Sequence, residues 1–229
     1  MSDGIFVKIC GITNEADALL CVGLGADALG FMFAPSPRQV TVRSVHDIVH
    51  RVPREVLTVG VFRDEARQRV VDLAGEAGVG AIQLHGHETA EDCRWIRQHT
   101  ACTIRAFSAG DRTIARFEEF GADYILIDGT SPGSGEVFDW RLAEGVVDHS
   151  RMIVAGGLHA GNVAQAIARL QPWGVDVSSG VESEPGRKDP QKVREFIHAA
   201  RAAADLSQRR RESDEPPASA SEPYDWMGG

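Results

Sequence analysis

The chain has 229 residues, of which 43% are hydrophobic, and that length fits one domain of ordinary size or a compact barrel with a large core. Its 24 basic and 33 acidic residues give a net charge of −9, which argues against a nucleic-acid or anionic-membrane partner. The four cysteines lack close paired spacing, and no apolar run resembles a signal peptide or a membrane span. We therefore expect a protein of the reducing cytoplasm.

Eight short apolar runs follow one another along the chain and are typical of buried strands. They cover residues 6–10, 28–33, 57–62, 81–84, 103–106, 124–128, 152–155 and 174–177. Segments with helical spacing separate them. The first helix is expected to begin after Thr13 or Asn14 as its N-cap, and the helical segment 114–120 to stop at Gly121.

Alternation of buried strands with helices predicts a parallel sheet covered by helices. Eight such units indicate a closed (β/α)8 TIM barrel. An open doubly wound sheet would give the same alternation, but it usually has fewer strands, and no Gly-x-Gly-x-x-Gly turn follows the first run. We expect a single barrel domain over residues 1–206, followed by a polar tail, 207–229, whose Arg, Glu, Pro, Ser and Ala content predicts disorder.

Glycine turns follow the last two predicted strands. The seventh ends in Gly156 and Gly157, and the eighth runs into a turn that contains Ser179 and Gly180. Main-chain N–H groups can approach an anion closely where no side chain intervenes, and the loops after strands seven and eight of such barrels commonly bind phosphate. These four residues are the predicted phosphate site.

Polar residues cluster at the predicted carboxyl ends of the strands, where barrels of this class place their active sites. They are Cys10, Arg38, Gln83, His85, Asp128 and Asp176. Each alone has a structural explanation, such as a buried cysteine acting as a small hydrophobe or an aspartate capping a helix. Their coincidence at one mouth favours an active site.

Lys8 and Cys10 are two residues apart on one strand, so their side chains share a face. The lysine could favour the Cys10 thiolate, or it could pair with a core carboxylate and leave Cys10 unaffected. Arg38 follows Pro35 and Pro37 in a stiff loop and could bind a carboxylate through two hydrogen bonds, or it could be a surface arginine. His85 and His87 lack a third ligand in range, so we predict no metal site.

The chain resembles the phosphoribosylanthranilate isomerases from about Val7 to Phe196. The motifs that carry the resemblance are Lys8-Ile9-Cys10-Gly11, Gly30-Phe31-Met32-Phe33, Ser36-Pro37-Arg38, Gly60-Val61-Phe62, Gln83-Leu84-His85-Gly86, Phe138-Asp139-Trp140, Ala155-Gly156-Gly157-Leu158 with Asn162-Val163, the segment from Val175 to Glu182, Pro185-Gly186 and Lys188-Asp189. They occur in the family's order. One loop departs from the family pattern, because Pro132-Gly133-Ser134-Gly135 stands where a Gly-Gly-Thr-Gly loop is usual.

The resemblance implies an Amadori rearrangement of N-(5-phosphoribosyl)anthranilate to 1-(2-carboxyphenylamino)-1-deoxyribulose 5-phosphate, the third step from chorismate in tryptophan biosynthesis. It implies that Cys10 is the general base, that Asp128 is the general acid and that Arg38 binds the anthranilate carboxylate. Gln83, His85 and Asp176 are expected to contact the substrate. No cofactor is expected, the ligand would be a small phosphosugar, and we favour a monomer.

Two other classes of function remain open at this point. One is another phosphosugar barrel, such as a ribulose-phosphate epimerase or the histidine-pathway isomerase, which performs the same rearrangement on a different amine and resembles this chain in the phosphate turns. The histidine-pathway enzymes typically have an aspartate at the position of Cys10, which favours the anthranilate substrate. A barrel that binds a sugar phosphate without converting it would be expected to lack Cys10 or Asp128, and both are present.

Overall fold

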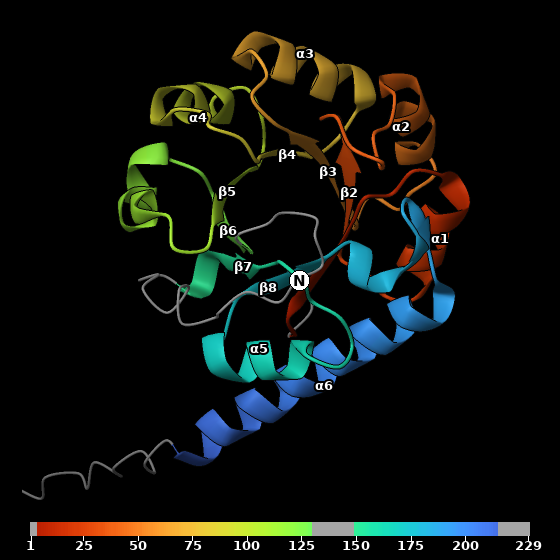
Figure 1. The fold of residues 1–229 in the computed structure, drawn as a ribbon, viewed down its shortest axis with the longest axis vertical. Coiled ribbons are helices and arrows are strands. Elements are labelled where there is room, and N and C mark those ends of the chain that lie inside the picture. Colours follow the sequence, from red (N-terminus) through yellow and green to blue (C-terminus); the bar gives the residue numbers. More distant parts are fainter. Residues whose placement is uncertain (1–3, 130–148, 215–229) are drawn as a thin grey trace, which may run out of the picture.

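The computed structural model describes residues 4–129 and 149–214, with side chains up to Arg209. Eight parallel strands pair in sequence order and close on themselves through β1 and β8 (Figure 1). The strands are β1 (Phe6–Cys10), β2 (Ala28–Met32), β3 (Leu57–Phe62), β4 (Ala81–Leu84), β5 (Thr103–Ser108), β6 (Tyr124–Asp128), β7 (Met152–Val154) and β8 (Gly174–Val177). The predicted barrel is confirmed, and every predicted strand is present with ends shifted by two residues at most.

Helices surround the barrel on its outside (Figure 1). They are α1 (Glu15–Gly23), α2 (Val42–Val49), α3 (Arg67–Ala77), α4 (Ala90–Arg97), η1 (Arg112–Phe120), η3 (His149–Arg151), α5 (Val163–Leu170), η4 (Ser179–Val181) and α6 (Pro190–Asp214). A short antiparallel hairpin, β9 (Glu182–Glu184) and β10 (Arg187–Lys188), lies between η4 and α6. Asn14 caps α1 by accepting a hydrogen bond from the Asp17 amide, which selects Asn14 from the two predicted caps.

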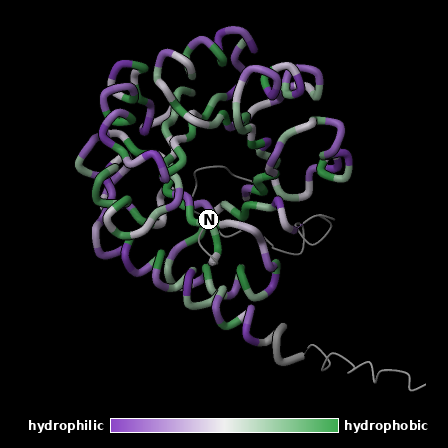
Figure 2. The backbone as a smooth tube through the Cα atoms, turned by 180° about the vertical axis from the view of Figure 1, so that it is seen from behind, coloured by the Kyte–Doolittle hydropathy of each residue, from purple (hydrophilic) through white to green (hydrophobic). Residues whose placement is uncertain are grey.

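The apolar core has two parts. The larger lies between the barrel and its helices, where Phe31 and Phe196 are fully buried. The smaller includes Val59, Ile104 and Leu126 on alternate strand positions, which face the barrel interior. Hydrophobic residues accordingly concentrate along the strands and hydrophilic ones on the outer helix faces (Figure 2). This packing leaves the strand ends to carry the polar side chains.

The segment after β5 differs from the prediction in its helix type. It forms the 3-10 helix η1, with a kink at Arg116, where we expected an ordinary amphipathic helix. Ile114, Phe117 and Phe120 are spaced by three residues, which places them on one face of a helix with three residues per turn. The predicted stop is confirmed, because Gly121 adopts the left-handed conformation at φ 65°.

The last helix continues past residue 206, where we expected the barrel domain to end. α6 runs to Asp214, and the Ser207 hydroxyl donates to the Ala203 carbonyl within it. The charged and amide residues that follow Ala204 are adequate helix formers, and no proline lies between Ala204 and Pro216. Residues 215–229, the rest of the predicted tail, lie outside the described residues. No helix in the described part is long and apolar enough to cross a membrane.

Candidate active site

A cavity of about 340 Å³ opens at the carboxyl ends of the strands. Six of the residues predicted for the site line it: Cys10, Arg38, Gln83, His85, Asp128 and Asp176. The barrel topology explains this convergence, since the six residues lie near or after the carboxyl ends of β1, β2, β4, β6 and β8. Among the described residues, Met32, Val61 and the proline-rich loop before Arg38 supply apolar walls.

Cys10 shares its surroundings with Lys8 and Asp176. The Lys8 ammonium is completely buried and lies 2.9 Å from Asp176 Oδ1. Burial opposes the charge on Lys8, but Asp176 and Cys10 outweigh it and raise the lysine pKa. Burial likewise raises the pKa of the Cys10 thiol, and Lys8 and Lys188 offset part of that effect. Lys8 thus does what each alternative expected in part. It pairs with the core carboxylate of Asp176, and it also limits the rise in the Cys10 pKa.

Asp128 ends a chain of side chains that starts at Gln83. Gln83 Nε2 lies 3.2 Å from His85 Nδ1, and His85 Nε2 lies 3.2 Å from Asp128 Oδ2. When the Gln83 amide donates to Nδ1, the imidazole hydrogen is on Nε2 and points to Asp128. The second carboxylate oxygen, Oδ1, accepts from the Gly129 amide at 2.7 Å. Asp128 is thus held between a main-chain donor and an imidazole.

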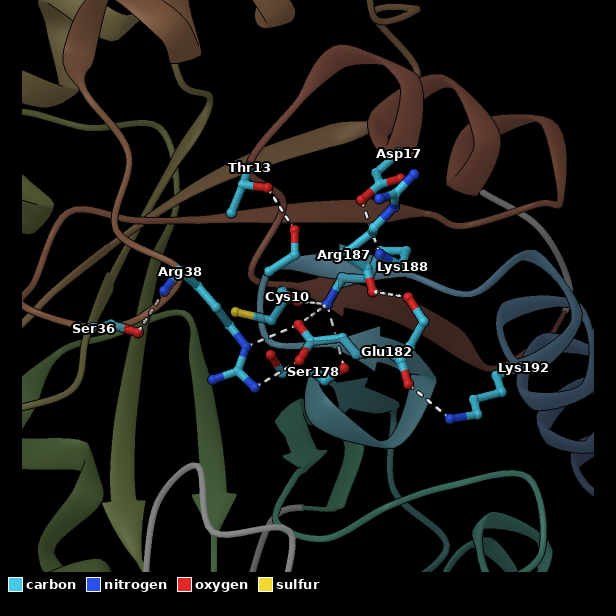
Figure 3. A network of polar contacts seen from close by, with 12 residues as sticks. Cys10, Thr13, Asp17, Ser36, Arg38, Ser178, Glu182, Arg187, Lys188 and Lys192 are labelled. Carbon is cyan, nitrogen blue, oxygen red and sulfur yellow. Dashed lines mark hydrogen bonds and ion pairs between the residues drawn. The ribbon is translucent and has the colours of Figure 1, made fainter.

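Arg38 is held by a carboxylate that we did not predict for the site. Its Nε and Nη2 donate to the two oxygens of Glu182 at 2.8 and 2.6 Å, and only 12% of its side chain is exposed, which excludes the surface-arginine alternative (Figure 3). Gly11 makes room for this arrangement, because a Cβ there would lie 2.5 Å from Arg38 Cδ. Lys188 also donates to Glu182. Glu182 and Lys188 belonged to family motifs, but the sequence did not reveal their contacts.

The predicted phosphate turns lie beside the cavity and are not among its lining residues. Gly156 and Gly157 have φ values of 85° and 65°, in the left-handed region that favours glycine. A Cβ on Gly180 would lie 1.9 Å from the Leu158 carbonyl oxygen, so the loops after β7 and β8 are in backbone contact. Ser179 begins η4, which spans only three residues.

Within residues 4–129 and 149–209, no group of three potential ligands could hold a metal ion. The motif at residues 138–140 and the Pro132-Gly133-Ser134-Gly135 loop lie outside the described residues.

A family model, a sequence relative and two solved structures are all phosphoribosylanthranilate isomerases. The sequence model of a family described as N-(5'phosphoribosyl)anthranilate (PRA) isomerase matches residues 7–199. An N-(5'-phosphoribosyl)anthranilate isomerase of Desulforudis audaxviator is 48% identical over 204 residues, which are 86% of this chain and 98% of that protein. The crystal structure of the phosphoribosyl anthranilate isomerase from Thermus thermophilus superposes with a TM-score of 0.80 at 37% identity and covers 85% of this chain and 98% of its own.

A second solved structure includes a bound ligand. It is a phosphoribosyl anthranilate isomerase in complex with reduced 1-(o-carboxyphenylamino)-1-deoxyribulose 5-phosphate, with a TM-score of 0.76 at 37% identity over 86% of this chain and 99% of that one.

Proposed function

The chain belongs to the N-(5'-phosphoribosyl)anthranilate isomerase family, and from this premise we propose that its cavity carries out the Amadori rearrangement of N-(5-phosphoribosyl)anthranilate in tryptophan biosynthesis. The observation that carries the proposal is the meeting of Cys10, Asp128 and Arg38 at one cavity. They supply a base, an acid and a cation, which are the groups that the reaction needs.

The reaction is an isomerisation, in which protons change position while substrate and product contain the same atoms. Protonation of the ribose ring oxygen opens the aminal to an iminium, which acidifies the proton on C2. Removal of that proton gives an enolamine, and its tautomerisation places a proton on C1 and leaves the ketone on C2. One general acid and one general base suffice, and each contributes about 10²- to 10⁴-fold when it is within hydrogen-bond reach. The chemistry asks for no metal or organic cofactor.

We assign the acid to Asp128 and the base to Cys10. His85, with Nε2 at 3.2 Å from Asp128 Oδ2, holds the Asp128 carboxyl group in place beside the substrate. Cys10 takes the C2 proton as its thiolate, the form that Lys8 and Lys188 favour and burial opposes.

The remaining residues orient the substrate. Arg38 binds the anthranilate carboxylate, while Gln83 and Asp176 contact the substrate from the same cavity. Gly156, Gly157, Ser179 and Gly180 bind the phosphate, for which the left-handed glycines support close main-chain approach. Binding far from the reacting bonds then serves to position the aminal.

We further propose a monomeric enzyme of the cytoplasm that acts on a small phosphosugar. All four cysteines are free, as a reducing compartment would keep them. Activity on the histidine-pathway amine is the alternative, and a competition assay with both substrates tests it directly.

The primary test is a time course of anthranilate-type fluorescence after phosphoribosylanthranilate is generated in place. Wild type should convert the substrate, whereas Cys10→Ser and Asp128→Ala should lower kcat by about 10²- to 10⁴-fold. Cys102→Ser is the matched control, since Cys102 does not line the cavity, and it should retain wild-type turnover. Undiminished turnover in Cys10→Ser or Asp128→Ala would exclude that residue from the mechanism. An inactive wild type would exclude phosphoribosylanthranilate as the substrate.

A further inference from the structure

Glu182 is a buried carboxylate that sits behind the cavity and touches two cations. It begins β9 and is only 6% exposed. Its Oε1 accepts from Arg38 Nε and from Lys188 Nζ, both at 2.8 Å, and its Oε2 accepts from Arg38 Nη2 at 2.6 Å (Figure 3). Glu182 does not line the cavity, whereas Arg38 does. Arg38 is therefore the cavity-lining residue that the carboxylate contacts directly.

The contacts with Glu182 occupy one edge of the guanidinium and leave the other edge free. Arginine has five N–H donors in a planar fork, and Glu182 uses the edge formed by Nε and Nη2. Within the part of the chain that the structure describes, no acceptor contacts Nη1, and Figure 3 shows the remaining guanidinium nitrogen pointing away from Glu182. The edge formed by Nη1 and Nη2 has the geometry that grips a second carboxylate.

The charges around Glu182 leave a positive balance. Arg38 and Lys188 each carry one positive charge, and Glu182 carries one negative charge, so one positive charge is uncompensated within this group. Burial alone would raise the pKa of Glu182, but Arg38 and Lys188 hold it below its ordinary value of 4.5. Glu182 is therefore ionised at neutral pH and does not cancel the attraction of Arg38 for an anion.

Lys188 fixes Glu182 to the ends of two strands. Besides Glu182, its Nζ donates to the carbonyl oxygens of Cys10 at 2.6 Å and Ser178 at 3.2 Å. Its main-chain N–H donates to Asp17 Oδ2 at 2.8 Å. Through Lys188, Glu182 is thus connected to the end of β1, the strand that carries Cys10.

We propose that Glu182 is a positioning residue that makes the site selective for ribosylated aryl amines bearing a carboxylate. It occupies one edge of Arg38 and so holds the other edge toward the cavity, where the carboxylate of the substrate binds. This inference rests on the proposed function of the cavity and deepens it, because it names the feature that separates carboxylated from uncharged aryl amines.

The experiment compares Glu182→Gln with wild type on two substrates, made by condensing ribose 5-phosphate with anthranilate or with aniline. Glutamine keeps the volume but not the charge, so it can no longer hold both nitrogens of Arg38. With the carboxylated substrate, KM should rise by about 10- to 100-fold with kcat within about threefold. With the aniline substrate, kcat/KM should be equal in both proteins. Equal losses on both substrates would overturn the proposal, because a merely structural role predicts them.

A double-mutant cycle shows whether Glu182 acts through Arg38. In the Arg38→Ala background, Glu182→Gln should change KM by less than about twofold, since the group that it positions is gone. Full additivity of the two substitutions would overturn the proposal.

A second variant keeps the proposal testable if Glu182→Gln fails to fold, as melting curves would reveal. Arg38→Lys retains the charge and a partner for Glu182, but one ammonium cannot present two edges. Its KM for the carboxylated substrate should approach that of Arg38→Ala, and a wild-type KM would overturn the proposal. In every arm, turnover of phosphoribosylanthranilate by wild type reports separately on the proposed function.

Discussion

Cys10 is the residue whose charge state most directly controls the proposed reaction. The charged groups around it are Lys8, Asp176, Lys188 and, through a weaker interaction, Arg38. Burial raises its pKa above the ordinary value of 9.0, and the two lysines reduce that rise without cancelling it. At neutral pH most molecules therefore carry the thiol, which is the wrong form for a general base.

We predict a kcat/KM that increases with pH across the neutral and mildly alkaline range. A base with a raised pKa gains its active, deprotonated form only as the pH approaches that pKa. Initial rates from about pH 6 to 9 test this expectation. Lys8→Met removes a cation that lowers the thiol pKa, so its profile should move to higher pH. A flat profile in wild type would exclude Cys10 as the titrating base.

At this scale the sequence predicted which residues meet but not how they are paired. Strand ends of a parallel barrel converge, so Cys10, Asp128 and Arg38 could be placed at one mouth from their positions alone. The Arg38–Glu182 pair joins residues 144 positions apart. Its geometry depends on how the loop after β2 packs on β9, which no local pattern encodes.

The two loops after β7 and β8 form the element on which the phosphate prediction depends. Asn162 fixes the first loop by accepting from the His159 amide at 2.8 Å and donating to the Gly157 carbonyl at 2.9 Å. Gly180 brings the second loop into contact with Leu158. The two loops are therefore in direct backbone contact, and a side chain at Gly180 would force them apart.

We predict that Gly180→Ala weakens phosphate binding by tenfold or more (~1.4 kcal/mol) while kcat with saturating substrate changes less. The added methyl would stand 1.9 Å from the Leu158 oxygen, so the loops must part. Competitive inhibition by inorganic phosphate measures the effect. Gly75→Ala is the control, because nothing lies within 4 Å of its Cβ in α3, and helix propensity should make it stabilising by about 0.5–1 kcal/mol. Unchanged inhibition in Gly180→Ala would show that the phosphate binds at another place.

Strands could be predicted more completely than helix types. Buried parallel strands are continuous apolar runs, so runs such as 57–62 and 174–177 coincide with β3 and β8. The end of a strand depends instead on its neighbour. β5 continues to Ser108 because that residue still pairs with Asp128 of β6, and the expected end at residue 106 could not include that partner.

For the whole molecule, the ion pair between Lys8 and Asp176 spans the seam where β1 meets β8. The two residues are direct register partners, and the side chains are 0% and 9% exposed. A charge in such a place is tolerated only while its partner is present. The pair thus contributes both to the closure of the barrel between β1 and β8 and to the electrostatic surroundings of Cys10.

We predict that Lys8→Met lowers the free energy of unfolding by about 3–5 kcal/mol, since it leaves Asp176 as an uncompensated buried charge. Adding Asp176→Asn should recover much of that loss. Urea unfolding of the single and double variants measures both values. Breaking the exposed pair of Arg51 and Glu15 with Arg51→Met should change the free energy of unfolding far less, because both side chains remain in water. A similar small loss in Lys8→Met would show that water or another group satisfies Asp176.

The same seam bears on how the protein is made. Lys8 and Asp176 are 168 residues apart, so at about 5–20 residues per second β1 is synthesised roughly 8–34 s before its partner strand. During that interval the unpaired edge of β1 is open to other nascent chains. A lysine within an apolar strand is one of the features that discourage such edge-to-edge association. The residue that completes the finished barrel therefore also carries the kind of charge that is expected to oppose aggregation of the unfinished one.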